Sequence, residues 1–421
     1  MNEREAALKA LYEIEFNGAY SNIALKNILS QCREMSRQSK AMTTALVYGV
    51  TDKKLTLDYY ISSFSKIKLK KISKYILIIL RMGIYQLIYM DKVPQSAAVN
   101  ESVKLAKRYG HSASAGFVNG ILRNVSKNSV EFPKAPNEYL SVKYSYPIWL
   151  CDKWIADFGF DFTEELMIAF EKNKKITLRP NTLKTTANEV SELLLKSGIE
   201  TEIYNGMIIS DGFDIEHNPL YADGYFTPQD IAAAETAKIL EPHRGELVID
   251  MCCAPGGKRT HIAELMGNEG KILAFDKYEH KIEIVKKNAE RLGIDIIDVK
   301  TADACELNET LINSADRVLC DVPCSGLGII GRKPDIKWNR EETSDIEEIQ
   351  KKILEHGAKY LKCGGVIVYS TCTIDKSENE AVTDAFIADN CDFVKDFEKT
   401  YYPNVDNTDG FYICKLRKKN D

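Results

Sequence analysis

The feature that most constrains the fold is an alternation of apolar and helical segments over residues 236–421. Short apolar runs such as GELVID, KILAFD and GGVIVYST are each followed by a stretch with the spacing of an amphipathic helix. Strands that alternate with helices in this way favour a parallel sheet covered by helices on both faces. We therefore predict an α/β domain with a mainly parallel sheet over this region.

Acidic residues lie where the apolar runs end. In open α/β sheets, ligands bind outside the carboxyl ends of the strands, so these positions carry the most functional information. A fifth run ends in a thiol, in the sequence Ser370-Thr371-Cys372. Any one aspartate could instead cap a helix, but together they predict a single crevice lined by carboxylates and a thiol. The aspartates are Asp250, Asp276, Asp303 and Asp321.

The loop after the first apolar run has the composition of a ligand-binding turn. It reads MCCAPGGK, and the two glycines allow the backbone to approach a ligand closely. Asp276 follows Gly257 by 19 residues, about where an acidic residue binds ribose hydroxyls in dinucleotide folds. Asp303 could accept the exocyclic amine of an adenine. Because no GxxxxGK[ST] motif occurs, we expect a nucleoside-containing cofactor rather than a phosphate cradle.

A second thiol follows another strand end, in Asp321-Val322-Pro323-Cys324. If the strands before Cys324 and Cys372 are neighbours, both thiols open onto the same crevice. A disulfide or two inert buried thiols would also fit the pattern. The chain has 11 cysteines, an odd number, and no Cys-x-x-Cys spacing. Reduced thiols and no metal site are expected.

The first part of the chain predicts a different architecture. Residues 1–130 show helical spacing throughout, and EFPKAPNEYL, with two prolines, predicts a linker. Residues 140–235 then read as strand, helix, strand, strand, a small α+β pattern. A chain of 421 residues exceeds one hydrophobic core. The prediction is a multidomain protein, with boundaries at 1–130, 140–235 and 236–421.

Charge and hydropathy limit where in the cell the protein is expected and what it is expected to bind. Residues 1–140 contain 21 Lys and Arg against 11 Asp and Glu, a net charge of +10, although the whole chain carries −5. This excess favours polyanion binding or, equally, a solvated helical surface. No apolar run approaches the roughly 20 residues of a membrane span, and the first residues lack the apolar core of a signal peptide. We expect a cytoplasmic protein.

Four motifs resemble those of one enzyme family in order and spacing. They are DMCCAPGGK, AFDKYEHK, DVPCSGLGIIGRKPDIKW and YSTCTIDKSENE. The sequence resembles the S-adenosylmethionine-dependent RNA (cytosine-5)-methyltransferases of the Nol1/Nop2/Sun family. AAVNESVKLAKRYG and FVNGILRN resemble the helical antitermination factor NusB. This combination is similar to bacterial members that act on 16S rRNA, and it implies an all-α NusB-like RNA-binding domain, a small α+β RNA-binding or bridging domain and a Rossmann-like methyltransferase domain.

The resemblance also implies roles for individual residues. Cys372 would be the nucleophile and Cys324 would assist product release, while Asp321 is placed to hydrogen-bond the N3–N4 edge of the base. Cys253 departs from the alanine that is frequent in the family, but both are small, so cofactor binding should survive. The residues implied to bind S-adenosylmethionine or line its pocket are Cys252, Cys253, Ala254, Pro255, Gly256, Gly257, Lys258, Asp276, Asp303 and Asp321.

The expected macromolecular partner is 16S rRNA or a small-subunit precursor, bound by a monomer. The target base must leave its stack, which favours loops or unfolded helices. Each basic side chain near the motifs could equally be a solvated surface charge. The candidates for phosphate binding are Lys172, Lys174, Lys175, Arg179, Arg332 and Lys333.

Three alternatives remain open from the residues alone. A DNA cytosine-5 methyltransferase would use Cys324 as its nucleophile and leave Cys372 without a role. An amino-methylating enzyme is disfavoured because Asp-Val-Pro-Cys stands in place of a [DN]PP[YF] motif. A non-catalytic RNA-binding or transcription factor with an inactive methyltransferase domain is conceivable, although both thiols and all the strand-end carboxylates are present.

Overall fold

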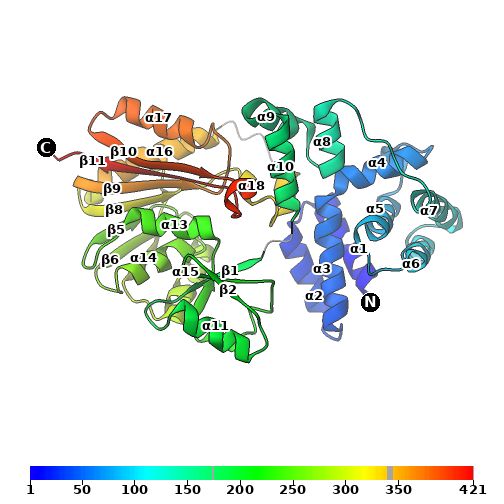
Figure 1. Ribbon diagram of the computed structural model, residues 1–421, viewed down its shortest axis with the longest axis horizontal. Helices are drawn as coiled ribbons and strands as arrows, with labels where there is room; N and C mark the ends of the chain where they lie inside the picture. Colours follow the sequence, from blue (N-terminus) through cyan, green and yellow to red (C-terminus); the bar gives the residue numbers. More distant parts are fainter. Residues whose placement is uncertain (173–174, 339–344, 421) are drawn as a thin grey trace. The chain divides into compact units, whose positions relative to one another are not determined.

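The computed structural model describes residues 1–172, 175–338 and 345–420. The chain divides into two compact units (Figure 1). The first, the helical unit, comprises Met1–Ile168 together with Lys333–Asn339, and the second, the sheet unit, comprises Ala169–Arg332 together with Arg340–Asp421. Among the described residues, no helix is long and apolar enough to cross a membrane.

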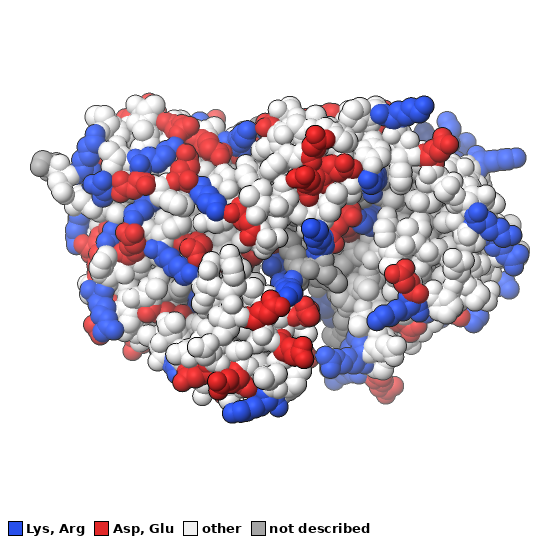
Figure 2. All heavy atoms as spheres, viewed as in Figure 1, with Lys and Arg blue, Asp and Glu red and all other residues white. Residues whose placement is uncertain are grey.

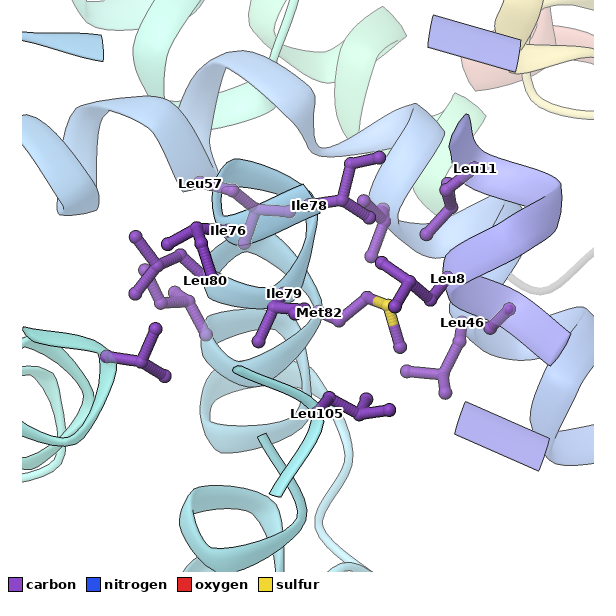
Figure 3. Packing of buried hydrophobic residues seen from close by; sticks show 14 of the residues in the cluster. Leu8, Leu11, Leu46, Leu57, Ile76, Ile78, Ile79, Leu80, Met82 and Leu105 are labelled. Carbon is purple, nitrogen blue, oxygen red and sulfur yellow. The ribbon is translucent and has the colours of Figure 1, made fainter. Parts of the chain in front are cut away.

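The helical unit is built around α5 (Lys74–Tyr89), which forms from the apolar run KYILIILRMGIYQLIY. Its Ile78, Ile79 and Met82 are at most 1% exposed, and Figure 3 shows them among leucines of neighbouring helices. The predicted helical first domain is confirmed. The other helices before residue 130 are α1 (Glu3–Asn17), α2 (Ser21–Gln31), α3 (Arg37–Asp52), α4 (Lys54–Phe64), α6 (Gln95–Tyr109) and α7 (Ser112–Val125), with a 3-10 turn η1 (Leu69–Lys71).

The helical unit extends beyond the predicted linker. The chain is irregular at 128–135, which includes the first half of the predicted linker 131–140. The second half of that prediction is wrong, because residues 136–140 begin helix α8, where Pro136 occupies the first turn and needs no backbone N–H. Three helices follow the irregular segment: α8 (Pro136–Tyr144), α9 (Ile148–Phe158) and α10 (Phe160–Glu171). In α4, Thr56 donates a hydrogen bond of 2.6 Å to the carbonyl of Val142 in α8. Compact units and sequence-derived domains need not coincide, so the division at 1–130, 140–235 and 236–421 stays a prediction.

A short segment from late in the sequence also belongs to the helical unit. The 3-10 helix η4 (Pro334–Lys337) lies just after the Cys324 motif in the chain. The Lys337 ammonium contacts Asp52 at 2.6 Å, and the Trp338 indole N–H donates to the carbonyl of Thr51 at 2.7 Å. These buried polar contacts account for the grouping of this segment with α3.

The sheet unit begins with a small antiparallel sheet in the order β2-β3-β1-β4. The predicted sequence of strand, helix, strand and strand is confirmed, and β4 adds a fourth strand. Thr186 and Glu189 form a reciprocal capping box that fixes the start of α11. The elements are β1 (Ile176–Pro180), α11 (Ala187–Lys196), β2 (Glu202–Tyr204), β3 (Met207–Ser210), α12 (Pro219–Ala222) and β4 (Phe226–Pro228).

The large sheet has the order β10-β11-β9-β8-β5-β6-β7. Five neighbouring strands, β9 to β7 in this order, are parallel, and β10 and β11 complete one edge in antiparallel pairing. The mainly parallel sheet predicted from the alternation is therefore confirmed. The strands are β5 (Leu247–Asp250), β6 (Lys271–Asp276), β7 (Ile297–Thr301), β8 (Ala315–Asp321), β9 (Leu361–Thr371), β10 (Phe393–Tyr401) and β11 (Phe411–Lys418).

Helices cover both faces of this sheet (Figure 1). On one face, strand residues such as Val248 and Val368 pack with α13, α14 and α15; on the other, Ile249 and Ile367 pack with α16 and α17. Consecutive strand residues thus enter different cores, as the pleat requires. The strand order reverses between β5 and β8, which are paired in parallel. In open α/β sheets, a ligand binds outside the carboxyl ends of the strands at such a reversal. The helices are α13 (Ile231–Leu240), α14 (Gly257–Leu265), α15 (Glu279–Leu292), α16 (Ile346–Tyr360), α17 (Glu380–Asp389) and α18 (Pro403–Asp406).

Candidate active site

Two thiols meet at the carboxyl ends of neighbouring strands. Strands β8 and β9 run parallel, with Asp321 opposite Ser370. Cys324 follows β8 and Cys372 follows β9, and their Sγ atoms lie 3.1 Å apart. The separation is that of two thiols in contact, since a disulfide bond is about 2.05 Å long. The structure thus brings together the two cysteines that the sequence placed at one crevice.

Backbone contacts hold the two cysteine loops against each other. The N–H of Gly328 donates to the carbonyl of Cys372 at 3.0 Å, and the N–H of Gly410 donates to the carbonyl of Gly328 at 2.8 Å. A Cβ atom at Gly328 would lie 2.0 Å from the Gly410 oxygen, so no side chain fits there. Only glycine fits at position 328, because the segments containing Gly328, Cys372 and Gly410 approach one another closely there.

Asp321 is fixed by one hydrogen bond at each oxygen. Oδ2 accepts from the Lys258 ammonium at 2.7 Å, and Oδ1 accepts from the Ser370 hydroxyl at 2.9 Å. The carboxylate therefore lies beside the strand end that leads to Cys372. Lys258 comes from the first turn of α14, so the ion pair joins the glycine-containing loop to the thiol pair.

The glycine-containing loop is held by the predicted acid of β6. Asp276 accepts hydrogen bonds of 3.1 Å from the backbone N–H groups of Ala254 and Tyr278. Pro255 follows Ala254 through a cis peptide bond. Gly256 has φ of +124° and precedes the first turn of α14, where a Cβ would meet Asn288 at 3.4 Å. The loop thus needs glycine here, and its backbone N–H groups begin a helix.

Asp303 is the third acid near this loop. It accepts the N–H of Cys305 at 2.9 Å and pairs with the Lys277 ammonium at 2.9 Å. The hydrogen bond from Lys277 lowers the pKa of Asp303 below its ordinary value. Carboxylates after β6 and β7, next to a helix start, offer acceptors for ribose hydroxyls and an adenine amine. This donor and acceptor set fits S-adenosylmethionine, whose cationic sulfonium also suits an acidic site.

Asp250, at the start of the loop motif, has a structural role. Asp250 is 0% exposed and pairs with Arg259 at 3.0 Å, while its other oxygen accepts the N–H of Cys252. The expectation that Asp250 faces the crevice is corrected: it fixes the loop from inside, because Arg259 neutralises it in the core. Burial raises the pKa of Cys253 to about 12 and that of Cys252 well above its ordinary value. Both thiols are therefore neutral.

Arg179 is the clearest correction among the expected phosphate ligands. It is 3% exposed, and its guanidinium forms a two-point ion pair with Glu264, at 2.8 and 3.1 Å. It also donates to the carbonyl of Gly257 at 2.8 Å. Because these partners occupy the guanidinium in the interior, Arg179 joins β1 to α14 in place of binding phosphate.

The other basic candidates have surface positions where the structure describes them. Lys172 is exposed, and the exposed Lys175 pairs with Glu202 at 3.0 Å. Arg332 pairs with Asp409 at 2.7 Å, and Lys333 is exposed in the helical unit. Lys174 lies outside the described residues. In Figure 2, Lys and Arg side chains stand out over α4 and α7, with a few acidic residues among them.

Glu378 and Gln350 were not singled out from the sequence. Both are 0% exposed and lie behind the Cys324 loop. Glu378 occurs in the polar stretch KSENE, which by itself predicts an exposed turn, and Gln350 lies in a charged helix. The only sequence signal was the proximity of Glu378 to Cys372, six residues earlier.

Comparisons with known proteins agree with this geometry. The family model for 16S rRNA methyltransferase RsmB/F matches residues 237–417. The NusB family matches residues 1–127, and a ferredoxin-like domain of RsmF/B-like methyltransferases matches residues 146–217. The chain is 37% identical to "Probable ribosomal RNA small subunit methyltransferase B" of Bacillus subtilis, over 99% of this chain and 98% of that protein.

The chain belongs to the family of ribosomal RNA small subunit methyltransferases B. A relative in Shewanella oneidensis, "Ribosomal RNA small subunit methyltransferase B", is 30% identical over 99% of both chains. The crystal structure of PH0851 superposes with a TM-score of 0.83 at 26% identity, covering 99% of this chain and 98% of the other. Family membership confirms the predicted methyltransferase class and its cofactor, S-adenosylmethionine. Asp276, Asp303 and the loop before α14 are the residues that would hold it.

Proposed function

We propose that this methyltransferase modifies C5 of a specific cytosine in 16S rRNA through a covalent bond between Cys372 and C6 of the base. The observation that carries the proposal is the thiol pair: Cys372 and Cys324 lie 3.1 Å apart beside Asp321. A single catalytic thiol would need no second thiol in contact with it. Relatives that share nearly the whole length of this chain are named as small-subunit rRNA methyltransferases, which supports the choice of substrate.

The chemistry begins with a poor nucleophile, since C5 of cytosine carries too little electron density to attack a methyl group. The Cys372 thiolate adds to C6, forming an S–C6 bond and moving the C5=C6 electron pair to C5. Asp321 is the candidate partner for the N3–N4 edge of the base, where it would stabilise the altered charge of the ring during addition. When bound, S-adenosylmethionine supplies an electrophilic methyl group to C5.

Release of the methylated base requires the loss of the remaining proton from C5. A base removes the remaining proton from C5, its electron pair re-forms the C5=C6 double bond, and the S–C6 bond breaks to return Cys372 as thiolate. Cys324 is the candidate for this base, or for the group that organises it, because its sulfur touches that of Cys372. The Cys324 sulfur would then lie near the S–C6 bond as that bond breaks.

The basic residues give a second, weaker line of support for an RNA substrate. Lys172 and Lys175 are exposed just before β1, and a surface pair such as Lys175 with Glu202 contributes little and exchanges readily with a phosphate. We include Arg332 and Lys333 in the proposed phosphate-binding set and omit Arg179. Cytoplasmic location, a monomeric state and the choice of 16S rRNA or its precursor particle belong to the same proposal.

The test separates the two thiols. With labelled S-adenosylmethionine and small-subunit rRNA fragments, Cys372→Ala should abolish methyl transfer. Cys324→Ala should accumulate a protein–RNA adduct that survives a denaturing gel. The exposed Cys391 supplies a matched control, since Cys391→Ala should behave as the unchanged enzyme. Normal turnover by Cys324→Ala, or methylation of DNA in preference to RNA, would contradict the proposal.

A further inference from the structure

A buried carboxylate lies behind the thiol pair and has no role in the chemistry described so far. Glu378 is 0% exposed. Its Oε2 accepts hydrogen bonds from the N–H of Ser325 at 2.9 Å and from the Gln350 amide at 3.0 Å. Within the described ranges, no lysine or arginine pairs with Glu378, and its buried Oε1 has no hydrogen-bond donor. An unpaired carboxylate in a protein interior is costly and is rarely retained for stability alone.

Glu378 and Gln350 together hold the chain on both sides of Cys324. Ser325, which follows Cys324, is held by Glu378, and Pro323, which precedes it, accepts a hydrogen bond of 2.9 Å from Gln350. The Ser325 hydroxyl also meets that of Thr373 at 2.8 Å, next to Cys372. This buried network fixes the position of the Cys324 thiol against Cys372.

We propose that Glu378 is a positioning residue that keeps the proton of the thiol pair on Cys324 and so leaves Cys372 as the thiolate. The inference rests on the proposed function, because it assigns the nucleophile to Cys372. The negative carboxylate lies on the Cys324 side of the pair and disfavours a second negative charge there. Cys324 then donates its S–H to Cys372, whose own proton has gone to solvent. A thiol that keeps its proton cannot itself take the proton from C5, so the inference assigns Cys324 the second of its two possible roles in release, that of organising the base.

The electrostatic surroundings agree with this assignment. The hydrogen bond with Cys372, burial, and the negative charges of Cys372 and Glu378 together raise the pKa of Cys324 well above its ordinary value. Burial, together with the charge of Glu378, likewise raises the pKa of Tyr369, whose hydroxyl donates to the Glu378 carbonyl at 2.6 Å. Tyr369 is therefore neutral and supplies no competing charge.

Two further carboxylates, Asp375 and Asp321, lie in the segments around the thiol pair, and an unpaired negative charge would by itself favour the proton on a nearby thiol. Asp375, in the same loop as Glu378, adds negative charge and helps burial to raise the pKa of Glu378, which hydrogen bonds from Ser325 and Gln350 oppose. Asp321 is paired with Lys258. No histidine lies in either cysteine motif to take the proton from Cys372. A Cys372 that is already a thiolate would be nucleophilic without such a base.

The inference is tested by alkylating the protein with iodoacetamide between pH 6 and pH 10 and locating the modified cysteines by mass spectrometry. Cys372 should react first and at lower pH than Cys324. Glu378→Gln keeps an oxygen for Ser325 and Gln350 but removes the charge. We expect it to reduce the preference for Cys372 by about tenfold and to move the pH midpoint of Cys324 downward.

Two further variants separate charge from structure. Glu378→Asp keeps the charge and should restore most of the preference, and Glu380→Gln, two residues along, should leave it unchanged. Preferential alkylation of Cys324 in the unchanged protein would overturn the inference, even if Glu378→Gln failed to fold. The inference would also be wrong if a folded Glu378→Gln variant showed the same preference for Cys372 and the same pH midpoint for Cys324 alkylation as the unchanged protein. Because this assay contains no RNA or cofactor, a failure of the inference can be told apart from a failure of the proposed function, which methyl transfer by Cys372→Ala would contradict.

Discussion

Replacement of Arg179 by alanine separates a structural role from an RNA-binding one. The guanidinium is in the interior, where Glu264, Thr260 and the carbonyl of Gly257 accept its hydrogen bonds. Removing it leaves the Glu264 carboxylate, 1% exposed at its side chain, without its ion-pair partner. Breaking one partner of a buried ion pair costs about 3 to 5 kcal/mol because the remaining charge stays desolvated.

A loss of this size is readily measured. For a unit of this length, each kcal/mol lowers the melting temperature by roughly 2 to 4 °C, so Arg179→Ala should melt about 6 to 20 °C below the unchanged protein. Replacing both Arg179 and Glu264 by methionine should recover much of the loss, since no charge is then left unpaired. Calorimetry should also show weaker S-adenosylmethionine binding, because Gly257 begins α14 at the cofactor loop.

The stability lost in Arg179→Ala, relative to the unchanged protein, should grow as the pH rises. Burial raises the pKa of Glu264, and the charge and hydrogen bonds of Arg179 oppose that rise. Without Arg179, the folded variant holds a proton on Glu264 to higher pH than the unfolded chain does. Stability from such a group is present at low pH and is lost as pH rises. Arg179→Ala should therefore lose more stability at pH 8 than at pH 5.

Lys175→Ala is the matched control for this experiment. Its exposed pair with Glu202 contributes little, so its melting temperature should stay near that of the unchanged protein. If Arg179→Ala instead melted normally and bound rRNA with a salt dependence reduced by about one phosphate contact, the structural role assigned to Arg179 would be wrong.

Two further substitutions test the cofactor loop and the backbone contacts of Gly328 that hold the two cysteine loops together. Asp276→Asn should weaken S-adenosylmethionine binding about 10- to 100-fold in calorimetry, because a charged acceptor is lost. The control is Asp298→Asn on β7, whose side chain is 40% exposed. Equal affinities of the Asp276→Asn variant and the unchanged protein would show that Asp276 only shapes the loop. Gly328→Ala should reduce methyl transfer at least about tenfold with little change in S-adenosylmethionine affinity, because the added Cβ would meet the Gly410 carbonyl at 2.0 Å and separate the two thiols. Unchanged turnover would mean that the loops tolerate this separation.

Sequence patterns predicted the elements whose signals are local. Residue spacing alone predicted three sets of elements, and each is present: the helices of residues 1–130, the strands ending at Asp276 and Asp321, and the small α+β region. The helices α8 to α10 and the segment Lys333–Asn339 were not assigned to the helical unit. Their placement depends on contacts such as Trp338 with Thr51, which join residues 287 positions apart.

The sequence by itself determined the chemical inventory: two thiols, a row of strand-end aspartates and a glycine-containing loop, because motifs and periodicity are properties of neighbouring residues. Only the tertiary structure decided which of these groups face one another. It brought Cys324 within 3.1 Å of Cys372 by pairing β8 with β9. It also buried Arg179 and Asp250 with their ion-pair partners and placed Glu378 behind Cys324, because burial and charge neutralisation depend on residues distant in the chain.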